Sequence, residues 1–445
     1  MTSYPAIPGL VTSDVFSVKA GGADIWVEKL RTDIDIDSLP EWFITEPYTR
    51  VQQEVHIASF ACVGSTEVRI AVPGGFNSAS LRPSSRAIGL SAEGNQLRFM
   101  LKGPDKLVLE IDDLPPLFLF ADAPETDVPE AGDPAVKYFG PGEHRPGLIT
   151  LADNESVYIA PGAIVYGGIR ADGAANIRVF GRGILDGDFE HQRMVLVENS
   201  RNVTFEGVTI RNGRSWTNTL INCRGLRYDG VKVISFGPGG DGINPLGSQD
   251  VVITGCFLRC TDDCIAIKSP GYDHVVKNVL IENNTMIGFA FSDGVTIGFE
   301  TNGPEVTGVH VRNCDVLLAR GGSRVDGHSG FSIICDGPAV IHDVLFEDIR
   351  VDEVEHKLFE LHITDGTKYG DDAPGHIRNI RLRNIDWGHE APIVIRGFSE
   401  ENRVEDVVFE NCTAGGLSLS EKQHLIQSGP YAEGIRVVRG NGSVE

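Results

Sequence analysis

Four aspartates lie where short apolar segments begin, and their carboxyl groups and spacing could support acid–base chemistry. They are Asp241, Asp262, Asp263 and Asp293. If the fold brings them together, they cannot all ionise freely, so one carboxyl is expected to keep its proton while a neighbour stays charged. Inverting cleavage of a glycosidic bond needs such a pair, with acid and base roughly 6.5–9.5 Å apart. The pattern therefore predicts a hydrolytic site.

Two other interpretations compete with this one. Asp241 and Asp293 are each followed by glycine, and Asp-Gly occurs eight times in the chain, mostly as a turn signal. The pair Asp262–Asp263 differs, because neither residue precedes glycine and adjacent acids before an apolar run are costly without a role. Aligned carboxylates would also suit a calcium ion. We nevertheless expect no metal and no organic cofactor, because two carboxyl groups and water suffice for hydrolysis.

A phrase of nine residues, repeated between Asn176 and Ala414, describes the elements that would position these aspartates. Each copy opens with Asn, Asp or Gly, has apolar residues at its second and fourth positions, and has Gly, Asn or Asp at its sixth. The copies begin at Asn176, Asn202, Gly225, Asp250, Asn278, Gly308, Asp343, Asn379 and Asp406. Alternation indicates a strand with one buried face, and the sixth position indicates a left-handed bend. Repeats of this kind are typical of a parallel β-helix.

The rest of the chain completes an all-β prediction. Residues 1–122 carry short alternating runs between turns, which favour a small β-sandwich. Residues 123–147 are rich in acidic residues, Pro and Gly and are expected to form a linker, and residues 148–445 would form the β-helix. The sandwich is expected to cover the open end of the helix, where an unpaired strand edge would otherwise be exposed.

Composition excludes several partners. The chain has 39 basic and 62 acidic residues and a net charge of −23, which disfavours nucleic acid and anionic membranes. No apolar segment has the length of a membrane span, and no signal peptide is visible. Cys256, Cys314 and Cys412 share one inward slot of the repeat, so we expect reduced thiols and a cytoplasmic protein, with secretion as the alternative if a leader was removed. The oligomeric state is left open.

At this point two motifs show a family resemblance. Gly240-Asp-Gly-Ile-Asn-Pro and Cys260-Thr-Asp-Asp-Cys-Ile-Ala-Ile-Lys-Ser resemble the catalytic core of the polygalacturonases of glycoside hydrolase family 28. The preceding segments Leu117-Phe-Leu-Phe-Ala-Asp and Tyr138-Phe-Gly-Pro-Gly are similar to those of the dextranase and isopullulanase family 49. The resemblance implies a right-handed β-helix and an inverting hydrolase of an oligo- or polysaccharide. By position, Asp262 would be the general acid, and Asp241 with Asp263 would hold and activate water.

Two departures from family 28 bear on the substrate. Asp293 stands in place of the family's His, and its Arg-x-Lys motif has no clear counterpart, although Arg320 and Arg324 lie in the same region. These departures favour a neutral, dextran- or pullulan-like glycan over polygalacturonate. The further candidates for substrate binding are Asp293, Lys268, Glu300, Trp216, His328, Arg324 and His362. A pectic hydrolase, a β-helix lyase or transferase, and a non-catalytic glycan-binding module stay open as alternatives.

Overall fold

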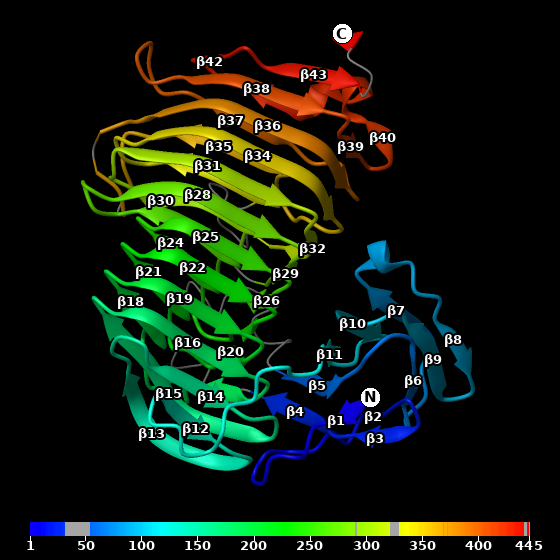
Figure 1. Cartoon of the computed structure of the whole chain (residues 1–445). Coiled ribbons are helices and arrows are strands. Elements are labelled where there is room, and N and C mark those ends of the chain that lie inside the picture. Colours follow the sequence, from blue (N-terminus) through cyan, green and yellow to red (C-terminus); the bar gives the residue numbers. More distant parts are fainter. Residues whose placement is uncertain are drawn as a thin grey trace.

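The computed structural model describes residues 1–31, 54–289, 292–320, 329–367, 369–371, 373–439 and 443–444. These residues form an N-terminal β-sandwich and a right-handed parallel β-helix (Figure 1). No helix in the described ranges is long and apolar enough to cross a membrane. The all-β fold class predicted from the repeats is confirmed.

The N-terminal part consists of two sheets packed face to face. One contains β1 (Thr2–Ser3), β4 (Val27–Arg31), β5 (Glu54–Ala61), β7 (Ala79–Arg82), β10 (Asp105–Ile111) and β11 (Leu117–Asp122). The other contains β2 (Ser17–Ala20), β3 (Ala23–Ile25), β6 (Thr66–Ala71), β8 (Ser91–Glu93) and β9 (Gln96–Leu101). Phe60 and Leu119 of the first sheet share a buried core with Val68 and Phe99 of the second, so the pair is a sandwich.

Each coil of the β-helix contributes a strand to three faces, and parallel strands stack from coil to coil. The first face contains β14 (Ser156–Ile159), β16 (Ala175–Gly181), β19 (Arg201–Glu206), β22 (Arg224–Asp229), β25 (Gln249–Thr254), β28 (Val275–Glu282), β31 (Glu305–Arg312), β34 (Val340–Val351), β36 (His376–Trp387) and β38 (Val404–Glu410). The second contains β17 (Ile184–Asp186), β20 (Thr209–Arg211), β23 (Lys232–Ile234), β26 (Phe257–Cys260), β29 (Thr285–Gly288) and β32 (Asp315–Ala319). The third contains β15 (Ala163–Asp172), β18 (Val195–Glu198), β21 (Asn218–Ile221), β24 (Ile243–Leu246), β27 (Ile265–Ser269), β30 (Val295–Thr301), β33 (Phe331–Cys335), β35 (Phe359–Ile363) and β37 (Ile393–Arg396). Short strands from β39 (Thr413–Ala414) to β44 (Ser443–Val444) follow.

The repeated phrase forms the first face, with its apolar positions directed inward. Phe205 and Tyr228 stack in neighbouring coils with their ring centroids 4.7 Å apart. All eight cysteines are buried free thiols, and the seven that lie in the β-helix pack inside its coils as small hydrophobic residues. The register runs without slippage across this face, for example Val203 opposite Leu226. A regular interior of this kind fixes the height of each coil and of the turns attached to it.

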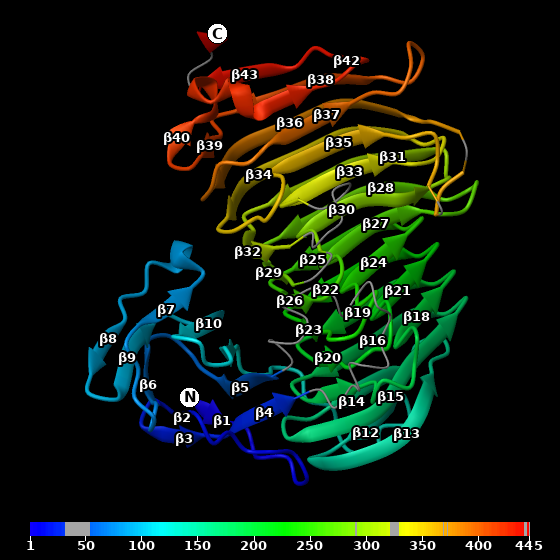
Figure 2. The same cartoon turned by 180° about the vertical axis from the view of Figure 1, so that it is seen from behind.

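Two expectations were wrong: where the β-helix begins, and which part of it the sandwich covers. Strands β12 (Val136–Phe139) and β13 (Gly142–Thr150) pair with β14 and β15, so the β-helix begins inside the segment predicted as a linker. The sandwich does not cover the open end of the helix. It packs beside the second face of the β-helix (Figures 1 and 2). Phe118 and Phe120 contact Phe257 there. Apolar side chains on the outside of β26 require such a cover.

Candidate active site

The candidate aspartates lie in the turns that lead from the second face to the third. Asp241 precedes β24, Asp262 and Asp263 join β26 to β27, and Asp293 precedes β30. Backbone hydrogen bonds hold the turns in register, since Gly242 N donates to the Asp263 carbonyl at 2.9 Å and Cys264 N donates to the Asp293 carbonyl at 3.0 Å. Residues that are 21 or more positions apart in the sequence thus become neighbours on consecutive coils.

Asp241, Asp262 and Asp263 form a compact triangle. One carboxylate oxygen from each lies within 4.8 Å of the other two. A triangle of this size has a centre about 2.8 Å or less from each corner, which is the length of an O–H···O hydrogen bond. One water molecule can therefore contact all three groups. The spacing is shorter than the roughly 6.5–9.5 Å expected between acid and base, because all three residues occupy adjoining turns.

Burial separates the three carboxyls chemically. Asp241 is 2% exposed and Asp263 is 7% exposed, whereas Asp262 is half-buried. Burial, followed by the charge of Asp262, raises the pKa of Asp241 well above its ordinary value. Burial also raises the pKa of Asp263, to about 6, against the opposing effect of the Lys268 ammonium. With a pKa of about 6, Asp263 is mostly ionised at neutral pH and is able to accept a proton.

Asp293 supports Asp263 from the next coil, and its role in substrate binding stays a prediction. Its side chain is fully buried and accepts hydrogen bonds from Ser329 N at 2.6 Å, from Thr296 Oγ1 at 3.0 Å and from the Ser332 hydroxyl. Its own backbone N donates to Asp263 Oδ1 at 3.0 Å. Burial, with the neighbouring charge of Asp263, holds the pKa of Asp293 well above its usual range. The residue shapes the site from below.

Lys268, Glu300 and Trp216 meet beside the triangle. Lys268 Nζ donates to Glu300 Oε2 at 2.6 Å and lies 4.9 Å from the centre of the Trp216 ring. A bulge makes this pairing possible: Ile267 faces Ile297, but Ser269 faces Thr301, so β30 has extra residues there. The pKa of Lys268 is raised because Glu300, Asp241 and Asp263 outweigh its burial. A buried ammonium at this position makes a bound calcium ion less favourable.

Several supporting residues were not among the candidates from the sequence. Asn244 Nδ2 donates to Asp241 Oδ2 at 2.8 Å, and its position inside the Asp-Gly-Ile-Asn motif is a signal that could have identified it. Ser235 Oγ donates to the Gly240 carbonyl at 2.6 Å and accepts from Thr261 N at 3.1 Å. This serine therefore ties the turn before Asp241 to the turn before Asp262. No local motif in the sequence marks that link.

The remaining candidates lie further away or outside the described residues. His362 lies on β35, where it aligns with Ile334 of the preceding coil. It is three coils beyond Lys268 along the third face, at about 4.8 Å per coil. Arg320 follows β32, and its carbonyl accepts from Ser292 N at 2.9 Å. Arg324 and His328 fall outside the described residues. Their roles in substrate binding stay predictions.

Comparisons with known proteins identify the family of the chain. Residues 164–411 match the model of the glycosyl hydrolases family 28. A probable exopolygalacturonase B of Aspergillus flavus is 24% identical over 224 residues, which cover 46% of this chain and 48% of the relative. Exopolygalacturonase B of Aspergillus niger is 22% identical over 251 residues, which cover 48% of this chain and 54% of the relative. The chain thus spans about half the length of these curated relatives.

Solved structures share the fold. Dex49A from Penicillium minioluteum aligns with a TM-score of 0.66 at 15% identity, covering 98% of this chain and 96% of its own. The exopolygalacturonase of Thermotoga maritima aligns with a TM-score of 0.54 at 17% identity, covering 70% of this chain and 85% of its own. The family match includes all three aspartates of the triangle. The chain belongs to the glycosyl hydrolases family 28.

Proposed function

We propose that the carboxylate triangle hydrolyses O-glycosidic bonds with Asp262 as general acid and with Asp241 and Asp263 holding the attacking water. The observation that carries this proposal is the convergence of one oxygen from each residue within 4.8 Å. Asp262 is the half-buried member and so the one best able to reach a glycosidic oxygen outside the turn. The two buried members are suited to water, which is small enough to reach them.

The proposed reaction is a single displacement. Asp263, as a carboxylate, takes a proton from the bound water, whose oxygen forms a bond to the anomeric carbon. The bond from that carbon to the leaving oxygen breaks, and the leaving oxygen receives the proton of Asp262. The product therefore has the opposite anomeric configuration. The close spacing also approaches the roughly 5–5.5 Å of retaining enzymes, but in them a carboxylate must itself reach the sugar carbon. Burial of Asp241 and Asp263 argues against that attack.

For the substrate we propose a pectic, galacturonate-containing glycan. The relatives named above are exopolygalacturonases, and they lend no support to the neutral glycan that the sequence departures favoured. Lys268 provides a buried cation beside the triangle. A neutral glycan is the second candidate, because the Lys268 ammonium is already paired with Glu300. An ammonium with such a partner has less to offer a substrate carboxylate.

The test is hydrolysis across matched substrates. Reducing-sugar release would be measured on polygalacturonate, rhamnogalacturonan, dextran and pullulan with the wild type, Asp262→Asn and Asp24→Asn. Asp24 is an exposed residue of the sandwich and gives the same chemical change away from the triangle. We expect release from the galacturonate polymer, a loss of about 100-fold or more in Asp262→Asn, and no loss in the control.

Each rival has its own outcome. Release from dextran or pullulan alone would replace the pectic substrate with a neutral one. An unsaturated product absorbing in the ultraviolet would identify a lyase, and disaccharide or cyclic products without new reducing ends would identify a transferase. Binding without turnover, unaffected by Asp262→Asn, would identify a non-catalytic module. A product that retains its anomeric configuration, observed by NMR, would refute the single displacement.

A further inference from the structure

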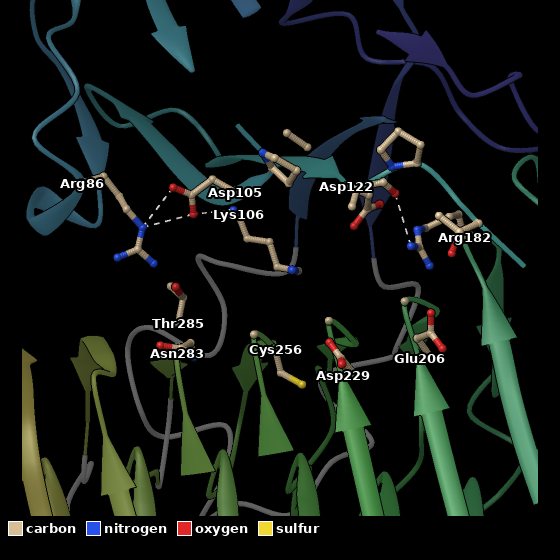
Figure 3. Close-up of a pocket in the computed structure, with 18 of the residues that line it drawn as sticks. Arg86, Asp105, Lys106, Asp122, Arg182, Glu206, Asp229, Cys256, Asn283 and Thr285 are labelled. Atoms are coloured by element: carbon tan, nitrogen blue, oxygen red, sulfur yellow. Dashed lines mark hydrogen bonds and ion pairs between the residues drawn. The ribbon is translucent and has the colours of Figure 1, made fainter. Parts of the chain in front are cut away.

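A second polar cavity lies between the sandwich and the β-helix. It has a volume of about 640 Å³, and its walls are the ends of β10 and β11 on one side and the bends between the first and second faces on the other. Figure 3 shows the Lys106 side chain reaching from the sandwich toward the bends that carry Cys256, Asn283 and Asp229. Left-handed glycines at 230 and 255 leave the space open at these bends.

The cavity is separate from the carboxylate triangle. Cys256 at its wall and Asp262 in the triangle lie at opposite ends of β26, and six residues of extended chain span about 20 Å. Between them, Phe118 and Phe120 of the sandwich pack on Phe257 and exclude solvent from the middle of the interface. A ligand in the cavity would therefore not touch the proposed acid or the proposed water.

Most charged groups of the cavity wall are already engaged. Arg86 pairs with Asp105 at 3.0 Å, and Asp122 pairs with Lys232 at 2.6 Å. The other acidic side chains of the wall, at positions 206 and 229, pair with arginines at 178 and 227. Among the described residues, the Lys106 ammonium has no hydrogen bond or ion pair. The cavity therefore contains a positive charge that is not paired with any described group of its walls.

A second donor beside Lys106 is also free. In the Asn ladder of the bends, Asn313 Nδ2 donates to Asn283 Oδ1 at 2.7 Å. The equivalent residue in the coil before Asn283 is Gly255, which has no side chain to accept from the Asn283 amide. Within the described part of the chain, Asn283 Nδ2 thus has no partner. Two unused donors, one of them charged, favour a ligand that presents an anionic acceptor.

The electrostatic surroundings of Lys106 also favour an anionic ligand. The Lys232 ammonium lies near that of Lys106, and the pKa of Lys232 is lowered to about 8 by burial, with Lys106 adding to the fall against the opposing effect of Asp122. An anion beside Lys106 would relieve the repulsion between the two ammonium groups. The protein as a whole carries a charge of −23, so a local cationic pocket is what an acidic polymer would need for attachment.

We propose that this cavity is a second glycan-binding site, which holds an acidic oligosaccharide by pairing a uronate carboxylate with Lys106 and a neighbouring acceptor with Asn283. The choice of a uronate rests on the proposed pectic substrate. Such a site would keep a polymeric chain attached while its end is cleaved at the triangle. Hydroxyl groups of the same chain would meet Thr285, which also lines the cavity.

The test is calorimetric titration of hexagalacturonate into Asp262→Asn, in which turnover is blocked, with and without changes at Lys106. We expect two binding sites per chain, of which Lys106→Met removes one and Lys106→Arg keeps both. Lys102→Met is the matched control, because Lys102 is exposed at the turn before β10. In the otherwise wild-type protein, Lys106→Met should raise KM for the polymer severalfold and leave kcat/KM for a disaccharide unchanged.

The outcomes distinguish this inference from the proposed function. A single binding site in Asp262→Asn, or equal titrations for Lys106→Met and Lys102→Met, would overturn the second site even if the wild type cleaves polygalacturonate. Loss of one site in Lys106→Met without any cleavage by the wild type would keep the second site and reject the pectic reaction. A neutral hexasaccharide that binds at Lys106 as well as hexagalacturonate does would overturn recognition through charge.

Discussion

At the scale of residues, Lys268 and Glu300 act in opposite directions on the proposed base. Lys268 lowers the pKa of Asp263, whereas Glu300 raises it, and the balance with burial gives a value of about 6. Because Asp263 must be ionised to accept a proton from water, kcat/KM should fall as the pH drops below about 6. The acidic limb of the pH profile therefore reports on this carboxyl.

Two substitutions should move that limb in opposite directions. Glu300→Gln removes a negative charge and should shift the limb to lower pH, whereas Lys268→Met removes a positive charge and should shift it to higher pH. The measurement is kcat/KM between pH 3.5 and 8 for both variants. Two limbs displaced in the same direction, or neither displaced, would show that Asp263 does not control the acidic side of the profile.

Ionisation of Asp263 should also lower the stability of the folded protein. Its folded pKa is raised to about 6 from the ordinary 3.8, so its favourable contribution is complete below about pH 4 and is lost as the pH rises through 6. At pH 7 the cost is about 3 kcal/mol. Asp263→Asn keeps an oxygen for the Asp293 backbone N, and it should raise Tm more at pH 7 than at pH 4 while abolishing activity. An equal change of Tm at both values would contradict a charge effect, and Asp24→Asn serves as the exposed control.

At the scale of elements, each copy of the repeat contains two left-handed positions, of which the sequence pattern indicates one. The sixth position of the phrase has a positive φ, as predicted, for example 60° at Gly255 and 59° at Asn283. The first position is left-handed as well, with 56° at Asn278 and 55° at Asp250. The same Asn, Asp and Gly preference was visible there. The alternation that follows dominates the pattern, so the first position predicts the start of a strand rather than a left-handed residue.

The first position also carries a ladder of side chains. Asn278 Nδ2 donates to Asp250 Oδ1 at 2.9 Å, and Asn202 Nδ2 donates to Asn176 Oδ1 at the same distance. Asn278→Ala would lose this hydrogen bond and keep a Cβ in a left-handed conformation, without the side-chain hydrogen bonding by which asparagine tolerates it, which costs about 1–2 kcal/mol. Asn278→Gly would lose only the hydrogen bond. We expect a lower Tm for the alanine variant than for the glycine variant, measured by calorimetry. The reverse order would refute the conformational argument.

The sequence could predict the aspartate turns but not the contacts made by their side chains. Register along a β-helix follows from the repeat, so Asp241, Asp262 and Asp263 were expected on adjoining coils, and they are. The burial of Asp293 depends on Ser332 and on Ser329 N, which belong to the next coil. The meeting of Lys268 with Glu300 depends on a bulge in β30 that the period of two conceals. The repeat therefore predicts the strands but not the side-chain contacts between coils.

At the scale of the whole molecule, buried ion pairs join the sandwich to the β-helix. Arg211 of β20 is almost fully buried, and it donates to Glu28 of β4 at 2.8 Å and to Asp186 at 2.7 Å. Lys232 of β23 similarly pairs with Asp122 of β11. These pairs flank the aromatic contacts around Phe257, so the interface combines apolar packing with fixed charges. Such charges specify one docking position, because any displacement would leave a charge buried without its partner.

Glu28→Ala should therefore weaken the whole molecule rather than the sandwich alone. The change leaves the Arg211 guanidinium with Asp186 as its remaining carboxylate, and removal of one partner of a buried pair costs about 3 kcal/mol or more. Glu67→Ala is the matched control, since Glu67 pairs with Arg69 on the exposed surface of the sandwich and such pairs contribute about 1 kcal/mol or less. In calorimetry we expect Glu28→Ala to lower Tm clearly more than Glu67→Ala. We also expect the wild type to unfold in one transition and Glu28→Ala to show an earlier, separate transition of the sandwich. Two transitions already present in the wild type, with Glu28→Ala unchanged from the control, would mean that the buried pairs do not couple the two parts.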